Sequence, residues 1–271
     1  MSSSNKMDEE PYGLRDDLMR LVRRAYLLYP RNMQSAVGPS AVGLQCDRSL
    51  AYLAKAPQRE SEAARQRESE ESQTVEQQAA QPNFGNDPIP SIVGTSVHAW
   101  LETAAGLDND VEQVLGDRPG PRWLTERRLS IATPEGYKIE GSCDLFDQWS
   151  GTVIDWKIVG ATTLRTINLH GPSQQYRVQS HLYGLGYKQL GLEVNDVAVC
   201  FIPRNGPLRD TRLFKQPFDE ALALTALRRL ESLDFLADWE DAEAKPSPKN
   251  CRYCAVPLNE CKEGWLERAE R

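Results

Sequence analysis

The chain has 271 residues, of which 40% are hydrophobic, and it carries a formal net charge of −7. This length allows one substantial hydrophobic core with a small added lobe. The negative charge argues against a general polyanion binder coated in lysine, so a nucleic acid would need a local basic strip. No apolar run is long enough to span a membrane and no secretion signal is evident, so we expect a cytoplasmic protein without a membrane partner.

The sequence divides into four segments by composition. Residues 1–57 form a helical segment, with a basic amphipathic helix expected at 11–30 and a second helix, beginning near Cys46, at 44–56. Residues 58–90 are rich in Arg, Glu, Ser, Gln and Ala and then in Pro, Gly and Asn, which is typical of a low-complexity linker or insert. We expect the core at 91–215, followed by a helix and a cysteine-containing tail at 216–271.

The core is expected to begin with a helix over residues 91–102. Gly94 and Thr95 supply a start signal, and apolar residues then recur at helical spacing. His98 and Glu102 are four residues apart, which places them on one face. A single histidine on a helix is more often a packed or exposed residue than a ligand, although imidazole is a common ligand of transition metals.

A strand at 123–131 is followed by a predicted β-hairpin that carries two acids. Residues 137–140 lead towards Asp144, and residues 152–154 lead into Asp155, with a turn at Ser150-Gly151 between the two runs. The hairpin would therefore present both carboxylates together.

The chemistry of these acids favours a metal-assisted reaction on a phosphodiester. Mg²⁺ and Mn²⁺ prefer oxygen ligands, so Asp144 and Asp155 could hold such an ion against a phosphate. Lys157 lies two residues beyond Asp155, so the alternation of a strand directs both side chains to the same face. Its ammonium could orient the attacking hydroxide or offset developing charge. A surface acid and base on a strand remain the simpler interpretation of this tripeptide alone.

After the hairpin, we expect a helix and two strands in the core, and then a long helix that leads to the tail. The helix at 173–190 places Gln179 and Tyr183 on one face, and an apolar strand follows at 196–203. A strand at 208–214 and a long helix at 218–240 complete the elements before the tail.

These elements together resemble the RecB-like branch of the PD-(D/E)XK nucleases, which includes CRISPR-associated RecB-like exonucleases and the nuclease domain of AddB. The resemblance rests on four ordered features, namely Gly94-Thr95-x-x-His98, Gly141-x-x-Asp144, Asp155-x-Lys157 and Gln179-x-x-x-Tyr183. It implies an α/β fold with a PD-(D/E)XK restriction-endonuclease-like core, which is a mixed central sheet flanked by helices in the order α-β-β-β-α-β. It also implies that the catalytic metal is held by His98, Asp144, Asp155 and the backbone carbonyl of Trp156. Lys157 would then be catalytic, with Gln179 and Tyr183 at the site and in contact with the nucleic acid.

The cysteines suggest a second cofactor. Cys251, Cys254 and Cys261 have the spacing C-x₂-C-x₆-C, and Cys46 is the candidate for a fourth ligand. Spacing alone does not choose between zinc and an iron–sulfur cluster, and unligated thiols are a third possibility. The resemblance implies a 4Fe-4S cluster held by one early and three late cysteines. The two other cysteines, Cys143 and Cys200, are expected to be thiols in the core.

The function that follows is a Mg²⁺- or Mn²⁺-dependent DNA exonuclease, with the resemblance favouring single-stranded DNA. The alternative is a nucleic-acid-binding subunit with a nuclease-like fold that does not cut, in a recombination, replication or CRISPR-adaptation complex. The sequence contains no phosphate-binding loop of the G-x-x-x-x-G-K-[ST] type, so unwinding a duplex would require a helicase partner. The resemblance points to a phage or CRISPR setting without choosing between them.

Overall fold

The computed structural model describes residues 21–22, 37–58, 89–116, 120–251, 254–257 and 260–261. The expected helix at 11–30 lies outside the described residues except for Leu21 and Val22, and so does nearly all of the expected linker at 58–90. No helix within the described part of the chain is long and apolar enough to cross a membrane.

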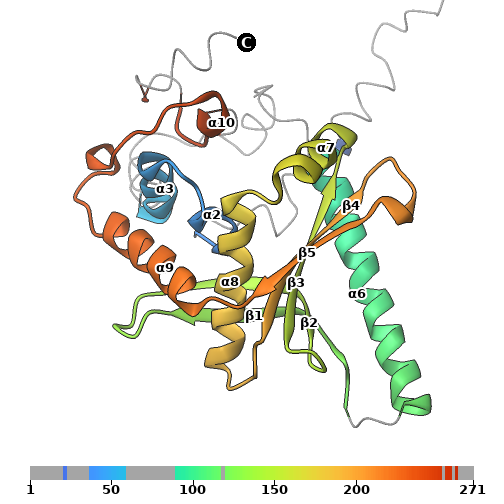
Figure 1. The fold of residues 1–271 in the computed structure, drawn as a ribbon. Coiled ribbons are helices and arrows are strands. Elements are labelled where there is room, and N and C mark those ends of the chain that lie inside the picture. Colours follow the sequence, from blue (N-terminus) through green and yellow to red (C-terminus); the bar gives the residue numbers. More distant parts are fainter. Residues whose placement is uncertain are drawn as a thin grey trace, which may run out of the picture.

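A five-stranded mixed sheet forms the centre of the structure (Figure 1). Its strands follow the chain order β1-β2-β3-β4-β5, and every neighbouring pair is antiparallel except β3 and β4, which are parallel. The strands are β1 (Trp123–Ala132), β2 (Lys138–Asp147), β3 (Thr152–Val159), β4 (Asp196–Pro203) and β5 (Arg212–Pro217). A parallel pair needs a crossover connection, which here contains the helices α7 (Ala161–His170) and α8 (Gln174–Gln189).

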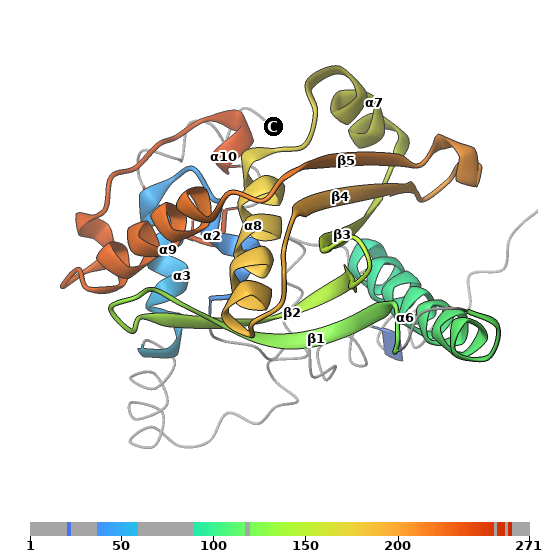
Figure 2. The same cartoon turned by 60° about the horizontal axis from the view of Figure 1, so that its bottom comes forward.

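Helices cover both sides of this sheet. α8 lies on one side and α6 (Ile89–Leu115) lies on the other, as Figures 1 and 2 show from two directions. The face of the sheet under α8 forms the main core, where the rings of Phe146 and Tyr187 stack with centroids 4.3 Å apart. α8 is buried along most of its length, whereas α6 has no buried residue. The mixed sheet flanked by helices that the resemblance implied is confirmed.

The segments before α6 and after β5 pack together on the outer side of α8. They comprise α2 (Pro39–Val42), α3 (Asp47–Ala54), α9 (Glu220–Asp234), a 3-10 turn at Trp239–Asp241 and α10 (Pro248–Cys251). Arg229 of α9 pairs with Asp47 and donates to the carbonyls of Val42 and Leu44, at 3.3 and 2.8 Å. The N-terminal helices are therefore held by the C-terminal part of the chain.

Gly141 on β2 allows α2 to approach the sheet closely. A Cβ atom at this position would lie 2.5 Å from Cδ of Pro39 and 3.4 Å from a ring carbon of Tyr183. The absence of a side chain at Gly141 therefore allows α2 and α8 to meet on β2, three residues before Asp144.

Most of the predicted elements are present, and several boundaries are wrong. The helix expected to end at residue 102 continues to Leu115. The strand expected at 208–214 is instead a 3-10 turn at Leu208–Asp210 followed by β5 from Arg212, because Pro207 and the turn delay the pairing with β4.

The helix α9, predicted at 218–240, is shorter than expected at both ends. Asp219 caps its N-terminus by accepting a hydrogen bond from the backbone of Leu222, and the helix ends at Asp234. The helix α7 was not predicted, since its sequence offers few apolar residues at helical spacing and only Ile167 is buried.

Candidate active site

The candidate site lies where β2 and β3 separate. Their ladder contains only three residue pairs and ends at Leu145 opposite Ile154. Asp144 is the first residue beyond it, and Oδ2 of its carboxylate accepts a hydrogen bond of 2.8 Å from the backbone N–H of Trp156. The side chain of Asp144 thus replaces a backbone partner and spans the gap between the strands.

Two further side chains converge on Asp144. Nδ1 of His98, on α6, lies 3.3 Å from Oδ1 of Asp144 and 4.0 Å from Oε1 of Glu126, on β1. Ligand atoms of these three residues all lie within 4.8 Å of one another, a separation that would allow one metal ion to contact all of them. Their side chains remain 10–17% exposed, so the group is accessible to a substrate.

Glu126 is a member of this group that the sequence analysis missed. Its φ of 43° makes it the only residue other than glycine with a positive φ in the described part of the chain. Such a conformation costs free energy for a side chain of this size, and strained residues of this kind concentrate at functional sites. The strand pattern at 123–131 gave no signal for it, because a glutamate among alternating residues resembles an ordinary exposed position. Glu102, which was expected to share a face with His98, is exposed and lies outside the group.

Asp155 and Lys157 lie next to this group, on β3. The Asp155 side chain is 1% exposed and the Lys157 side chain 19%, with Nζ 2.5 Å from Oδ2. Neither oxygen of Asp155 accepts a hydrogen bond of good geometry, so the contact with Lys157 is an ion pair that leaves the carboxylate under-satisfied. An ionised carboxylate buried in this way needs further positive charge or donors.

The electrostatics of the site favour a cation. Burial is the main reason that the pKa of Asp155 is raised to about 6; the charge of Lys157 opposes this shift, and the charge of Asp144 adds to it. Burial would lower the pKa of Lys157, but the charges of Asp155 and Asp144 outweigh it and the pKa is raised, so the ammonium stays charged. Burial likewise opposes protonation of His98, yet its hydrogen bond to Asp144 raises the net pKa. The negative charge at the site is therefore only partly neutralised by the protein itself.

The backbone carbonyl of Trp156 points to the same gap. In a strand, the N–H and C=O of one residue point to the same side. The N–H of Trp156 faces Asp144, so its carbonyl faces the opening between β2 and β3 as well. Oxygen donors with one imidazole suit Mg²⁺ or Mn²⁺, and the under-satisfied carboxylate of Asp155 beside them fits such an ion.

The structure brings the two predicted residues of α8 to the same region. Gln179 and Tyr183 are both buried, and Nε2 of Gln179 donates to Oη of Tyr183 over 3.4 Å. Burial raises the pKa of Tyr183 well above its ordinary value, helped by the negative charge of Asp155, so it is a neutral phenol. Nζ of Lys157 lies over the ring of Tyr176, also on α8, at 5.4 Å from the ring centroid, and the sequence analysis did not predict this contact.

The predicted cysteine ligands all lie in the lobe formed by the N-terminal helices and the tail. The N–H of Lys245 donates to Sγ of Cys46 over 3.3 Å, and Sγ of Cys254 lies 3.4 Å from Oγ of Ser49. Cys251 and Cys261 are buried in the same lobe. Among the described residues, these four sulfur atoms are not within 4.8 Å of one another as a group. Cys143 and Cys200 are buried, as expected of core thiols.

Comparison with known proteins gives a family match over most of the chain. A family model described as PD-(D/E)XK nuclease superfamily matches residues 20–258, well over half of the sequence. A solved structure described as "Crystal structure of SSO0001" is 16% identical, with a TM-score of 0.46, and the match covers 89% of this chain and 94% of that one. No curated protein matches the chain.

Proposed function

The chain belongs to the PD-(D/E)XK nuclease superfamily, and on that basis we propose that it is a metal-dependent DNA exonuclease acting on single-stranded DNA. The observation that carries the proposal is the buried, under-satisfied carboxylate of Asp155, paired with Lys157 beside the group formed by His98, Glu126 and Asp144. Burying a carboxylate that lacks hydrogen-bond donors destabilises the fold, and a divalent cation bound between Asp155 and a phosphate would offset this cost in free energy.

In this proposal, Mg²⁺ or Mn²⁺ would be held by His98, Asp144, Asp155 and the carbonyl of Trp156, and Glu126 would add a further oxygen. The bound ion would lower the pKa of a water molecule and offset charge on the phosphate. Asp144 also holds β3 at the correct distance through the N–H of Trp156. One side chain thus ties the geometry of the strands to that of the ligands.

Lys157 is proposed to act on the nucleophile and the phosphate. Its ammonium stays charged and is fixed between Asp155 and the ring of Tyr176, so it is oriented before substrate arrives. Gln179 and Tyr183 are proposed to contact the DNA. Because the phenol of Tyr183 is neutral, it can donate a hydrogen bond to a phosphate oxygen.

We also propose that Cys46, Cys251, Cys254 and Cys261 hold a 4Fe-4S cluster, with structural Zn²⁺ as the alternative. Support comes from two contacts between the N-terminal helices and the tail, namely that of Cys46 with the N–H of Lys245 and that of Cys254 with Ser49 on α3. A cluster in this lobe would join segments that are distant in sequence, so the free energy of binding it would become free energy of folding. A cytoplasmic location, where thiols remain reduced, is consistent with this role.

The activity is tested with single-stranded oligonucleotides labelled at either end, incubated with and without Mn²⁺. We expect shortening from one end that requires the metal and is abolished by Asp155→Asn and Lys157→Met. Binding without any cutting by the native protein would instead favour the alternative, a non-catalytic subunit of a recombination, replication or CRISPR-adaptation complex. Cutting of single strands but not of a blunt duplex would fit a requirement for a helicase partner.

The cluster is tested by anaerobic purification and metal analysis. We expect a brown protein with a broad absorbance band at about 400 nm, which arises from charge transfer from thiolate to iron. Cys46→Ser should remove most of the iron, while Cys200→Ser, a matched change of a core thiol, should retain it. A colourless protein with one zinc per chain would replace the cluster with the zinc alternative.

A further inference from the structure

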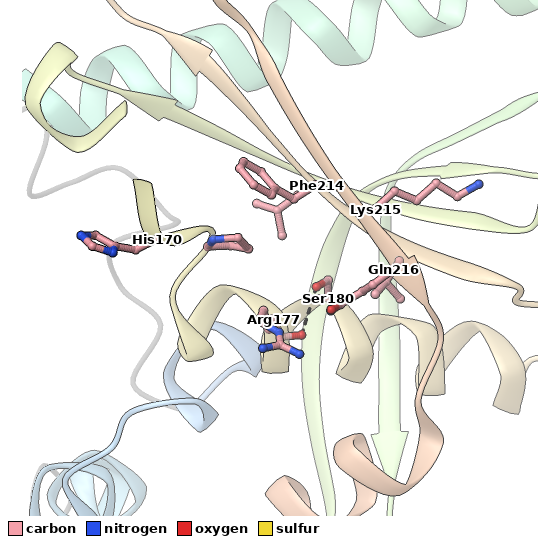
Figure 3. A pocket seen from close by; sticks show the side chains of 9 residues that line it. His170, Arg177, Ser180, Phe214, Lys215 and Gln216 are labelled. Atoms are coloured by element: carbon pink, nitrogen blue, oxygen red, sulfur yellow. Dashed lines mark hydrogen bonds between the residues drawn. The ribbon is translucent and has the colours of Figure 1, made fainter. Parts of the chain in front are cut away.

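A pocket of about 300 Å³ lies between α8, β4 and β5, beside the candidate active site. Figure 3 shows Phe214 of β5 above it, with Arg177 and Ser180 of α8 on the opposite side and Gln216 farther along β5. Val197 and Val199 of β4 complete an apolar floor. The proposed metal and cluster ligands take no part in this pocket.

The strand register places the pocket next to Asp155. Val199, on the pocket floor, is the partner of Asp155 across the parallel β3–β4 pair, and Phe214 is the partner of Val199 across β4–β5. With strands spaced about 4.8 Å apart, Phe214 lies roughly 10 Å from Asp155 along this row. The rings of Tyr176, Phe201 and Phe214 form a connected series, with centroids 5.7 and 5.8 Å apart, that begins at the contact of Tyr176 with Lys157.

The pocket combines the apolar side chains of Val197, Val199 and Phe214 with the guanidinium of Arg177. The Arg177 guanidinium is exposed and makes no hydrogen bond or ion pair with any residue in the described part of the chain. Lys215 also borders the pocket, but its ammonium points away and pairs with Asp196 at 2.8 Å (Figure 3). The positive charge available to a ligand is therefore that of Arg177, which can bind a phosphate in a bidentate manner.

Gln216 adds a hydrogen-bonding group with a defined orientation. Nδ1 of His181 accepts a hydrogen bond from the N–H of Asp219, so the proton of this neutral imidazole lies on Nε2. Burial lowers the pKa of His181, which favours the neutral form. The amide nitrogen of Gln216 lies 2.8 Å from Nε2 of His181, and two donors cannot hydrogen-bond to each other. We therefore assign the amide in the flipped orientation, in which its oxygen accepts from His181 and its N–H groups are left for the pocket.

From this arrangement we infer that the pocket binds one unpaired nucleotide of the DNA strand that enters the active site. The base packs against Phe214 and the valine floor, its edge accepts from Gln216, and its phosphate pairs with Arg177. A cavity of this size admits one base, and a base can enter only when it is neither paired nor stacked in a duplex. This inference rests on the proposed function, since it gives that site a structural basis for selecting single strands.

The inference is tested by binding in EDTA, where no cutting occurs. A fluorescein-labelled single strand and a blunt duplex are titrated with the native protein and with Arg177→Gln and Phe214→Ala, using fluorescence anisotropy. Stacking of one base on an aromatic residue contributes about 1–3 kcal/mol, so Phe214→Ala should weaken single-strand binding roughly 5- to 150-fold. Arg177→Gln removes the cation that pairs with the phosphate and should also weaken single-strand binding, and both variants should leave duplex binding unchanged. Arg228→Gln, which removes the same charge from α9, is the matched control and should change neither affinity by more than about twofold.

Calorimetric titrations with small ligands separate a nucleotide site from a simple anion site. A deoxynucleoside 5′-monophosphate should bind the native protein more tightly than inorganic phosphate or the free nucleoside, and Arg177→Gln should lose this preference. Equal binding of the monophosphate and inorganic phosphate would overturn the inference, as would no binding of either or an equal effect of Arg177→Gln and Arg228→Gln. If the native protein binds as expected but never cuts, only the proposed function fails. If it cuts, and the two pocket variants keep the native KM for single strands, only the pocket fails.

Discussion

Replacing Lys157 by methionine should destabilise the protein as well as inactivate it, because Asp155 would lose the cation with which it forms an ion pair. The Asp155 carboxylate is 1% exposed, and no hydrogen bond satisfies it. Removing one partner of a fully buried ion pair costs about 3–5 kcal/mol. Because 19% of the Lys157 side chain is accessible to water, we expect the lower end, about 3 kcal/mol.

A double variant, in which Asp155 is also replaced, tests whether the unpaired charge causes this loss of stability. Asp155→Asn in the Lys157→Met background removes the unpaired charge, so the double variant should return to within about 1 kcal/mol of the native free energy of unfolding. Both variants should remain inactive in the end-labelled assay. The double variant would thus regain stability without regaining activity, because stability requires only that no charge is buried unpaired, whereas activity requires the carboxylate and the ammonium themselves.

The measurement is urea denaturation in EDTA at pH 7.5, followed by tryptophan fluorescence. Lys188→Met is the matched control, because its Nζ lies 2.5 Å from Oε2 of Glu220 but the two side chains are 51% and 42% exposed. An exposed pair of this kind contributes only about 0–1 kcal/mol. The reasoning is refuted if Lys157→Met costs no more than Lys188→Met, or if the double variant is as unstable as the single one.

Three further predictions concern the metal ligands, the backbone and pH. Glu126→Gln should weaken Mn²⁺ binding about tenfold or more by calorimetry without unfolding the chain, and an unchanged affinity would remove Glu126 from the site. Gly141→Ala should lower the free energy of unfolding by about 1–3 kcal/mol, because its Cβ would lie 2.5 Å from Pro39. Gly94→Ala is the control and should not lower it, since no atom lies within 4 Å of the added Cβ. Equal melting temperatures for the two variants would contradict this prediction. For His181 the folded pKa lies below the ordinary value of 6.5 because of burial, so the unfolded chain binds the proton more strongly and stability should be lost as pH falls below about 6.5. Urea denaturation at pH 7.5 and 5.5 measures this loss, which should be smaller in His181→Gln.

Local patterns in the sequence were sufficient to predict the elements that carry the site. The strand at 196–203 matches β4, and the helix at 173–190 matches α8 to within one residue at each end. The spacing of Asp155 and Lys157 placed them on one face because strand alternation is a property of neighbouring residues. Where a boundary depended on a cap or a turn, the pattern alone misplaced it: the helix that Asp219 caps begins at Glu220 and not at 218, and the strand after Pro207 begins at Arg212 and not at 208.

The sequence by itself thus determined the order of the strands and of the helices other than α7, together with the acids and lysine of the hairpin, since periodicity and turn residues act over a few positions. Only the tertiary structure decided that Glu126 joins His98 and Asp144, because that group depends on one strained backbone angle and on three elements meeting. The same is true of the pocket beside Val199, which exists only where β4 and β5 pair under α8. Contacts between residues far apart in the chain depend on how the sheet and helices pack, and no local pattern encodes that packing.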